Sequence, residues 1–537
     1  MPGTSAGAKK PALLPAGEPL LQQAARAALW NAVLLPVVSL FNLAFAVVIR
    51  RKFGLFSGVY DVLIGLLNAL LVYSSLGVPT SLAKFLPEVA TLSGGAEVRR
   101  FLRLTATIRL GCLAALLVPL NIFAAPVAER LGLGAEGRLY FGLLSALAMV
   151  RAVSNFTSQT LNAFFAQQWS NSFALAQVVL DIAFVGLALL LGFEMAGVLG
   201  GVVASATVVA IWSLRRTQQV VRRLDVGQSE DEQEHDREWW KSLAGRFYRF
   251  SAFSYLLGFV GILTDIGFAA PALALVLEAE GVALFSTAFK LTFMTVVLVV
   301  SGFRGLYQPV FARLRLRNDA GQLQHAFVSV SKAQLVGLLP AGIGLMVLSG
   351  DYIPLLFGAE FQPAVPIAWI LIAFMYAETA LNLPNIILSV DEQYRALLWT
   401  QAVAVVAAPL FVITARSTGL VGAAVVLGGA RLATALLGYA ICRRTYGVRF
   451  PWRFGFKVGA VGLAMAAAIG AARTKWPTSP IEAVTLTVLG MLVYLVGLKL
   501  ARVLGPDEID LLRRSRIPGH KWAIAWLAAS RNEDASY

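Results

Sequence analysis

The stretch NSFALAQVVLDIAFVGLALLLGF at residues 171–193 carries a single acidic residue, Asp181, in a segment that is otherwise almost entirely apolar. A helix needs about 20 apolar residues to cross a bilayer, and this segment is long enough. A carboxylate near the middle of such a span is costly in lipid, so it must face protein or a wet cavity. The segment therefore predicts a membrane-spanning helix with a buried acidic group.

About fourteen segments of this kind, each near the ~20 residues that a span needs, fill the chain. Of its 537 residues 58% are hydrophobic and 14% are charged, which leaves too little polar surface for a water-soluble protein. We therefore expect an all-α polytopic membrane protein. The expected spans are residues 27–48, 57–78, 104–125, 139–165, 171–193, 196–214, 251–277, 283–302, 333–350, 366–388, 396–415, 419–441, 454–472 and 481–500.

Loops and charge runs divide the chain into six parts. These are a cytoplasmic tail (1–26), an N-lobe of six helices (27–214), a cytoplasmic linker with an interfacial helix (215–250), a C-lobe of six helices (251–441), two extra helices (442–503) and a second cytoplasmic tail (504–537). A surface helix is expected from Pro506 onward, with acids at its start and bases toward its end.

Lys and Arg cluster in alternate loops, as the positive-inside rule predicts for a multi-pass protein of the cell membrane with both termini cytoplasmic. The net charge of +15 therefore reflects orientation, and no nucleic-acid partner is expected. The main exception is the group Arg50, Arg51 and Lys52, which this arrangement places on the outer side.

The two groups of six spans repeat one another. Leu55-Phe56-Ser57 is matched by Leu284-Phe285-Ser286, and Arg151, Asn155 and Ser158 are matched at a nearly equal offset by Glu378, Asn382 and Asn385. Because six is an even number, the second copy enters the membrane in the same direction as the first. The pattern predicts two parallel repeats around a central cavity.

Charged and amide side chains within the spans predict a polar substrate cavity, because each charge is costly in lipid. Arg151 and Asp181 form a possible neutral pair in the first group, whereas Asp265 and Glu378 stand against Arg431 in the second. The alternative is a set of buried ion pairs that only lock helices together. The expected cavity residues are Arg151, Asn155, Asp181, Lys290, Arg304, Asn382, Asn385 and Arg431.

Two pairs are expected to have special roles. Asp61 and Lys290 correspond in the repeat, and we expect them to attract one another and close an outward gate. Asp265 and Glu378 are expected to form a coupling site for a proton or sodium ion. In the alternative, Arg431 or Lys290 neutralises one of these acids permanently and the site is structural.

The sequence motifs of enzymes that can be found in this chain do not indicate catalysis. Gly132, Gly134 and Gly137 satisfy GxGxxG, but they fall in a short outer loop between two spans, without the strand that the motif requires. The three histidines have no metal-ligand spacing. We expect no catalytic residue, no metal site and no cofactor apart from a coupling ion.

The segments FGLFSGVY (53–60) and SLGVPTSLAKFLPE (75–88) resemble the polysaccharide-transport branch of the multidrug, oligosaccharidyl-lipid and polysaccharide exporter (MOP) superfamily. Members of that branch are lipid-linked oligosaccharide flippases. The resemblance implies two six-helix lobes with alternating access, an undecaprenyl-diphosphate-linked glycan as substrate, and membrane lipids and polysaccharide-assembly proteins as partners.

Other functions stay open. Two extra C-terminal spans are similar to those of lipid II flippases, but the Arg-Asp element of those proteins is missing, since the first span offers only Asn31 and Asn42 as strongly polar groups. Drug exporters of the superfamily rely on membrane-embedded acids, so a cation-coupled antiporter of small organic ions is the second alternative. A membrane glycosyltransferase is the third, and the short outer loops argue against it.

Overall fold

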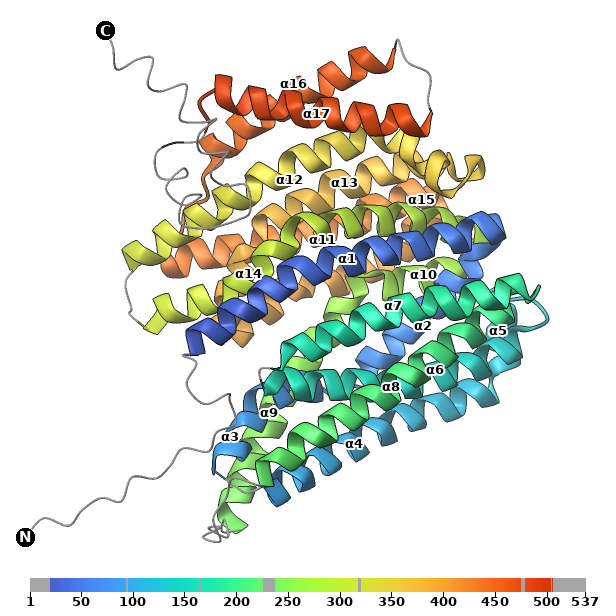
Figure 1. Cartoon of the computed structure of the whole chain (residues 1–537), viewed down its shortest axis with the longest axis vertical. Coiled ribbons are helices and arrows are strands. Elements are labelled where there is room, and N and C mark those ends of the chain that lie inside the picture. Colours follow the sequence, from blue (N-terminus) through green and yellow to red (C-terminus); the bar gives the residue numbers. More distant parts are fainter. Residues whose placement is uncertain are drawn as a thin grey trace, which may run out of the picture. The chain divides into compact units, whose positions relative to one another are not determined.

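The computed structural model describes residues 20–92, 95–164, 166–225, 237–316, 320–474, 479–503 and 505, and within them it is built of helices without strands (Figure 1). The expected surface helix from Pro506 lies outside these residues. The α-helices are α1 (Leu20–Phe53), α2 (Gly58–Tyr73), α3 (Val78–Leu92), α4 (Gly95–Ile122), α5 (Ala124–Arg130), α6 (Gly137–Ala163), α7 (Gln167–Leu190), α8 (Met195–Asp225), α9 (Arg237–Gly261), α10 (Ile266–Ala274), α11 (Ala279–Leu316), α12 (Ala320–Phe357), α13 (Ala364–Leu381), α14 (Leu383–Val390), α15 (Tyr394–Tyr446), α16 (Trp452–Arg473) and α17 (Pro480–Leu500).

Among the described residues, 12 helical segments are long and apolar enough to cross a membrane, which confirms the all-α polytopic fold class. Two of them contain a break. Leu34–Tyr73 includes the short 3₁₀ helix η1 (Gly54–Ser57), and Tyr394–Tyr446 includes Gly419, whose φ of 69° and ψ of −155° separate two helices. The expected total of fourteen spans stays a prediction.

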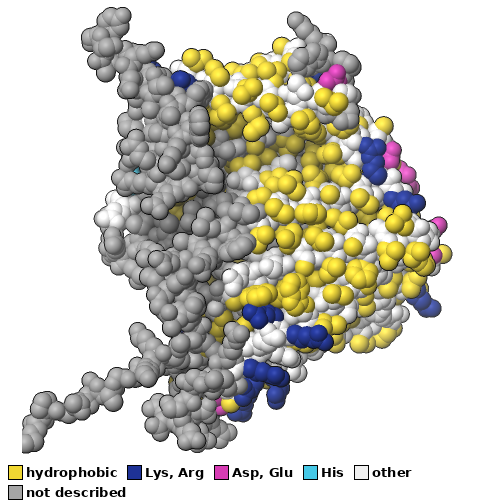
Figure 2. All heavy atoms as spheres, in the orientation of Figure 1, with side chains coloured by type: hydrophobic (Ala, Val, Ile, Leu, Met, Phe, Trp, Pro, Cys, Tyr) yellow, Lys and Arg dark blue, Asp and Glu magenta, His cyan; other side chains and the backbone are white. Residues whose placement is uncertain are grey.

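Large apolar side chains cover much of the helical surface. Figure 2 shows hydrophobic side chains across the visible face, and Leu190, Val406 and Phe456 are 87%, 70% and 74% exposed. Such exposure would be unfavourable over a wide area in water, whereas lipid tails solvate it. The surface therefore agrees with a multi-pass membrane protein.

Close packing divides the chain into two units. Unit 1 comprises residues 1–48, 56–283 and 404–412, and unit 2 comprises residues 49–55, 284–403 and 413–537. The seventh expected span, 251–277, thus packs with the helices of unit 1. Packing units and sequence repeats are different properties, so the lobes expected at 27–214 and 251–441 stay a prediction.

The seventh span is broken into two helices. The aromatic segment before it is continuous with α9, which ends at Gly261, and the 3₁₀ helix η2 (Ile262–Thr264) follows. Asp265 then begins α10, where its carboxylate accepts a hydrogen bond from the backbone N–H of Gly267 at 3.4 Å. Asp is a favoured N-cap because its oxygen satisfies one of the free N–H groups of a first turn.

Small residues let α2 pack closely on α10 within unit 1. A Cβ atom added at Gly65 would lie 2.7 Å from Cδ of Pro271 of α10, and one at Gly58 would lie 1.8 Å from the carbonyl oxygen of Ala279, the first residue of α11. Helices in membranes commonly associate through such small residues, because dispersion contacts between backbones replace the hydrophobic effect.

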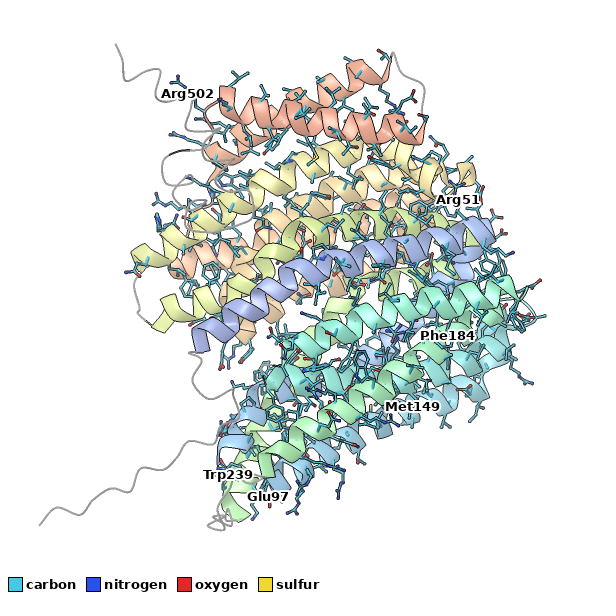
Figure 3. All side chains as sticks on the ribbon, viewed as in Figure 1. Arg51, Glu97, Met149, Phe184, Trp239 and Arg502 are labelled. Carbon is cyan, nitrogen blue, oxygen red and sulfur yellow. The ribbon has the colours of Figure 1, made fainter. Side chains whose placement is uncertain are left out.

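The basic group at the end of α1 belongs to unit 2 and is held within it. Arg50 is 1% exposed; its Nε donates to Oγ1 of Thr287, and its guanidinium carbon lies 5.6 Å from the ring centre of Phe357. Nε of Arg51 (labelled in Figure 3) donates to the carbonyl oxygen of Leu356 at 2.9 Å. Cations are favourable at a helix C-terminus, so the end of α12 stabilises the charge of Arg51.

The hairpin α16–α17 is fixed to α12, and the three helices lie side by side in Figure 1. Arg473 at the end of α16 pairs with Asp351 of α12 at 2.7 Å. Toward the other end of α17, the hydroxyl of Tyr494 donates to the carbonyl oxygen of Val336 at 2.7 Å. The two extra helices are therefore an integral part of unit 2.

Candidate functional site

Two polar clusters lie among apolar helices, one in each unit. The first cluster consists of Arg151 of α6, Gln177 and Asp181 of α7, and Ser205 of α8. The second cluster consists of Glu378 of α13, Asn382 and Asn385 at the start of α14, and Arg431 of α15. Each is described by itself below.

Asp181 is the centre of the first cluster. Its Oδ2 lies 3.4 Å from Nη2 of Arg151, which confirms the expected pair, and its Oδ1 accepts hydrogen bonds from Gln177 Nε2 at 2.8 Å and from the Ser205 hydroxyl. The whole residue Asp181 is 8% exposed. Three donors on one buried carboxylate offset part of its desolvation cost.

The sequence builds this cluster from helix geometry. Gln177 and Asp181 are four residues apart and therefore lie on the same face of α7, toward α8. Figure 3 labels Met149 of α6 and Phe184 of α7. A one-turn offset between an amide and an acid within an apolar span is the signal that would have identified Gln177 from the sequence.

Arg431 and Glu378 form the core of the second cluster. Nη2 of Arg431 lies 3.3 Å from Oε2 of Glu378, and their side chains are 18% and 11% exposed. A second contact anchors the same stretch of α13, because Gln334 Nε2 of α12 donates to the carbonyl oxygen of Thr379 at 2.9 Å. This pairing is the one required by the structural alternative, in which Arg431 neutralises Glu378.

Asn382 and Asn385 extend the second cluster along α14. Nδ2 of Asn385 donates to Oδ1 of Asn382 at 2.8 Å. Oδ1 of Asn385 is buried without a hydrogen-bond partner among the described residues, and a Cβ atom added at Gly438 would lie 2.0 Å from it. Since Gly438 is seven residues after Arg431 on α15, both contacts lie on one face of that helix. A free acceptor in this position can receive a hydroxyl group.

The matched positions of the repeat carry opposite charge. Arg151 is the base of the first cluster, whereas Glu378, at the corresponding position, is the acid of the second. Each cluster is close to neutral by itself, which keeps the cost of burying its charges low. Neutral pairs with further hydrogen-bonding groups can bind a polar solute without trapping an ion.

The remaining expected site residues are placed as follows. Asn155 is exposed on α6, Lys290 is partly exposed on α11, Asp61 is 2% exposed in the first turn of α2, and Asp265 caps α10. The side chain of Arg304 lies outside the described residues. Within the described residues, no group of three or more His, Cys, Asp or Glu side chains is arranged to hold a metal ion.

Sequence reasoning missed Arg109, Gln177 and Ser205. Arg109 was overlooked because the expected third span began at residue 104, which put Arg109 near its end. The helix actually begins at Gly95, so Arg109 lies at its middle.

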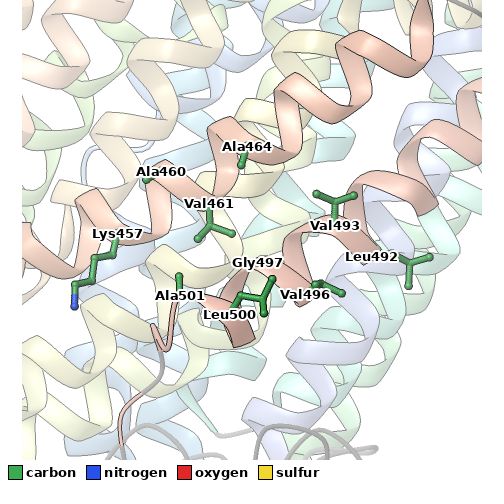
Figure 4. A pocket seen from close by; sticks show the side chains of 10 residues that line it. All are labelled: Lys457, Ala460, Val461, Ala464, Leu492, Val493, Val496, Gly497, Leu500 and Ala501. Carbon is green, nitrogen blue, oxygen red and sulfur yellow. The ribbon is translucent and has the colours of Figure 1, made fainter. Parts of the chain in front are cut away.

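An apolar groove lies between α16 and α17 (Figure 4). Its volume is about 690 Å³, and its lining is apolar apart from Lys457 at one end, as the close view shows. The lining side chains include Val461, Leu492 and Val496. This groove suits hydrocarbon rather than a sugar or an ion.

No protein-family model and no curated protein sequence matches this chain. Solved structures do. The chain is similar to the lipid II flippase MurJ in an inward closed conformation, with 13% identity, a TM-score of 0.66, and 89% of this chain and 98% of that chain covered.

Two further solved structures are transporters of the MOP superfamily. An inward-facing multidrug resistance MATE family transporter matches with 16% identity, a TM-score of 0.54, and 78% of this chain and 98% of that chain covered. A MOP superfamily transporter from Pyrococcus furiosus matches with 15% identity, a TM-score of 0.50, and 79% and 96% covered. The chain therefore has the fold of these transporters.

Proposed function

We propose that the protein is a flippase that moves a lipid-linked oligosaccharide, of the undecaprenyl-diphosphate type, across the cell membrane for surface polysaccharide assembly. The observation that carries this proposal is the presence of polar clusters among apolar helices, one in each unit, in a fold shared with a lipid II flippase. Two lobes with alternating access would expose these clusters to one side of the membrane and then to the other.

The chemistry of the clusters suits a glycan. A sugar headgroup cannot cross hydrocarbon unaided, because its hydroxyl groups would lose water without replacement. Asn382, Asn385 and the other neutral polar groups can exchange hydrogen bonds with hydroxyls, while the arginines attract a diphosphate. The lipid tail stays in the bilayer, so the path needs to accommodate only the polar part.

Transport without chemical change is part of the proposal. The substrate leaves the protein with its bonds intact, and the energy comes from the substrate gradient or from a proton or sodium gradient. The termini are proposed to be cytoplasmic, and polysaccharide-assembly proteins are proposed partners.

Two other substrates remain as alternatives. The likeness to MATE transporters favours a cation-coupled antiporter of small organic ions, but it covers 78% of this chain against 89% for the flippase. Lipid II is the less favoured lipid substrate, because the first span carries the uncharged Asn42 and lacks the Arg-Asp element of lipid II flippases.

The purified protein in liposomes tests the proposal. A fluorescent undecaprenyl-diphosphate oligosaccharide is placed in both leaflets, and a membrane-impermeant quencher is added outside. The fluorescence of molecules in the inner leaflet is protected from the quencher and is lost as these molecules move to the outer leaflet. We expect the protein to accelerate this loss, and to act more weakly on fluorescent lipid II and not on ethidium. Ethidium transport without any movement of the lipid-linked sugars would overturn the proposal in favour of the antiporter.

A further inference from the structure

Arg109 is a buried charge that the polar clusters do not include. It lies at the middle of α4, about 21 Å from the first residue at the helical rise of 1.5 Å per residue, and it is 2% exposed. The side chain belongs to the buried stripe of α4, which also contains Phe101, Thr105, Leu113 and Leu117. Because α4 packs on α6 and α8, this stripe faces the interior of unit 1.

The guanidinium of Arg109 has no counter-ion among the described residues. Its Nε and Nη1 atoms are buried without a hydrogen-bond partner there. The nearest hydroxyl on its own stripe, that of Thr105, donates to the carbonyl oxygen of Phe101 at 2.9 Å. Arg151 and Arg431, by contrast, each lie within 3.4 Å of a carboxylate oxygen.

This arrangement is unfavourable unless an anion joins it. An arginine at the centre of a span costs about 2.5–3.5 kcal/mol on insertion scales, and the side chain keeps its proton in proteins. A buried charge without a partner costs more than a paired one. A protein that retained Arg109 for packing alone would be more stable with an apolar side chain of similar size.

We propose that Arg109 is a binding residue for a phosphate or diphosphate group within unit 1. A guanidinium presents several N–H donors in one plane and matches the oxygens of a phosphate better than any other side chain. The ligand reaches Arg109 when α4 separates from α6 or α8, and charge compensation then favours the occupied form. The inference rests on the proposed function, because it assigns the diphosphate of the lipid-linked substrate to this residue.

The test measures stability and binding on the same full-length variants in detergent. Arg109→Met keeps most of the side-chain volume and removes the charge, and Arg109→Lys keeps the charge without the planar donors. Arg103→Gln is the matched control, since Arg103 is exposed on the same helix. The probes are geranylgeranyl diphosphate, geranylgeraniol as its uncharged counterpart, and inorganic pyrophosphate.

We expect Arg109→Met to melt at a higher temperature than the parent without ligand and to bind geranylgeranyl diphosphate about tenfold or more weakly, as for a lost charged hydrogen bond. Arg109→Lys should be intermediate, and Arg103→Gln should match the parent in both measurements. Geranylgeraniol should not bind in an Arg109-dependent manner. Competition by pyrophosphate would identify the phosphate alone as the ligand group, and its absence would show that the lipid is also required.

Two results would overturn the inference, and they have different meanings. If the parent and Arg109→Met bind the diphosphate lipid equally, and Arg109→Met melts at a lower temperature, Arg109 is structural while the proposed function stands. If the parent binds no diphosphate lipid and moves no lipid-linked sugar, the proposed function fails as well.

Discussion

Nη2 of Arg431 lies 3.3 Å from Oε2 of Glu378, and this ion pair joins α15 to the last turn of α13 within unit 2. The pair is buried, so its attraction is little screened by solvent, but both charges have also lost water. Its main consequence is that removing Arg431 alone takes away the charge that faces the buried Glu378 carboxylate.

Arg431→Met should therefore destabilise the protein by about 3–5 kcal/mol, the usual cost of breaking a buried pair from one side. The double variant Arg431→Met with Glu378→Gln should recover most of this loss. Melting temperature in detergent, read by loss of the monodisperse peak, is the measurement. Arg443→Met is the control, because Arg443 is exposed in the last turn of the same helix. A double variant as unstable as the single one would contradict the prediction.

The first cluster should show a hierarchy of effects. Ser205→Ala removes one donor to Asp181 and should cost about 0.6 kcal/mol and at most about 1.7 kcal/mol, as measured for hydrogen bonds between membrane helices. Arg151→Met removes the counter-ion and should cost about 3–5 kcal/mol. The same melting assay orders the two. Equal losses for both variants would show that the pair with Arg151 contributes no more than the hydroxyl.

Coupling of transport to an ion gradient can be tested with two acids of the second half of the chain, Asp265 and Glu378. If Asp265 and Glu378 carry a proton or sodium ion, Asp265→Asn and Glu378→Gln should each reduce the dependence of liposome transport on an imposed gradient. Glu129→Gln, at an exposed position of α5, should leave that dependence unchanged. Gradient dependence equal to the parent in both acid variants would show that these carboxylates do not couple transport and that the pair with Arg431 is structural.

The expected gate between Asp61 and Lys290 is tested by exchange of charges. Asp61→Lys should lower the transport rate, because two cations at a gate repel, and the double variant Asp61→Lys with Lys290→Asp should restore it. Cysteines at both positions should be joined by a reagent of about 10 Å when the cavity faces the cytoplasm, a distance of about one Debye length at 0.1 M salt. The assignment of this gate is wrong if the double variant does not restore transport and no cross-link forms in any state.

The C-terminal tail should be dispensable. The last described helix ends at Leu500, so ending the chain after Leu504 removes none of the described helices and should leave transport largely intact. Ending it after Arg473 is the contrasting variant, since it removes Tyr494 and Thr487, which bind α12, and it should lower the melting temperature. Complete loss of transport by the shorter deletion, at normal abundance in the membrane, would show that the tail is essential.

The sequence by itself determined the all-α polytopic fold and the ion pair of the first polar cluster. Span length and hydropathy are local properties, so segments such as 171–193 could be recognised without any tertiary contact. The pair between Arg151 and Asp181 was also predictable, because two opposite charges in adjacent spans of one group have few other partners.

Tertiary structure decided which charges meet. Asp265 caps α10, and Arg431 binds Glu378, a pairing that depends on how α13 and α15 pack. The helix start at Gly95 placed Arg109 at mid-span. Arg50 turned inward because Thr287 of α11 offers it an acceptor and Phe357 at the end of α12 offers it a ring. Hydropathy measures the cost of a charge in lipid, whereas the partner that offsets this cost comes from a distant part of the chain and is specified only by packing.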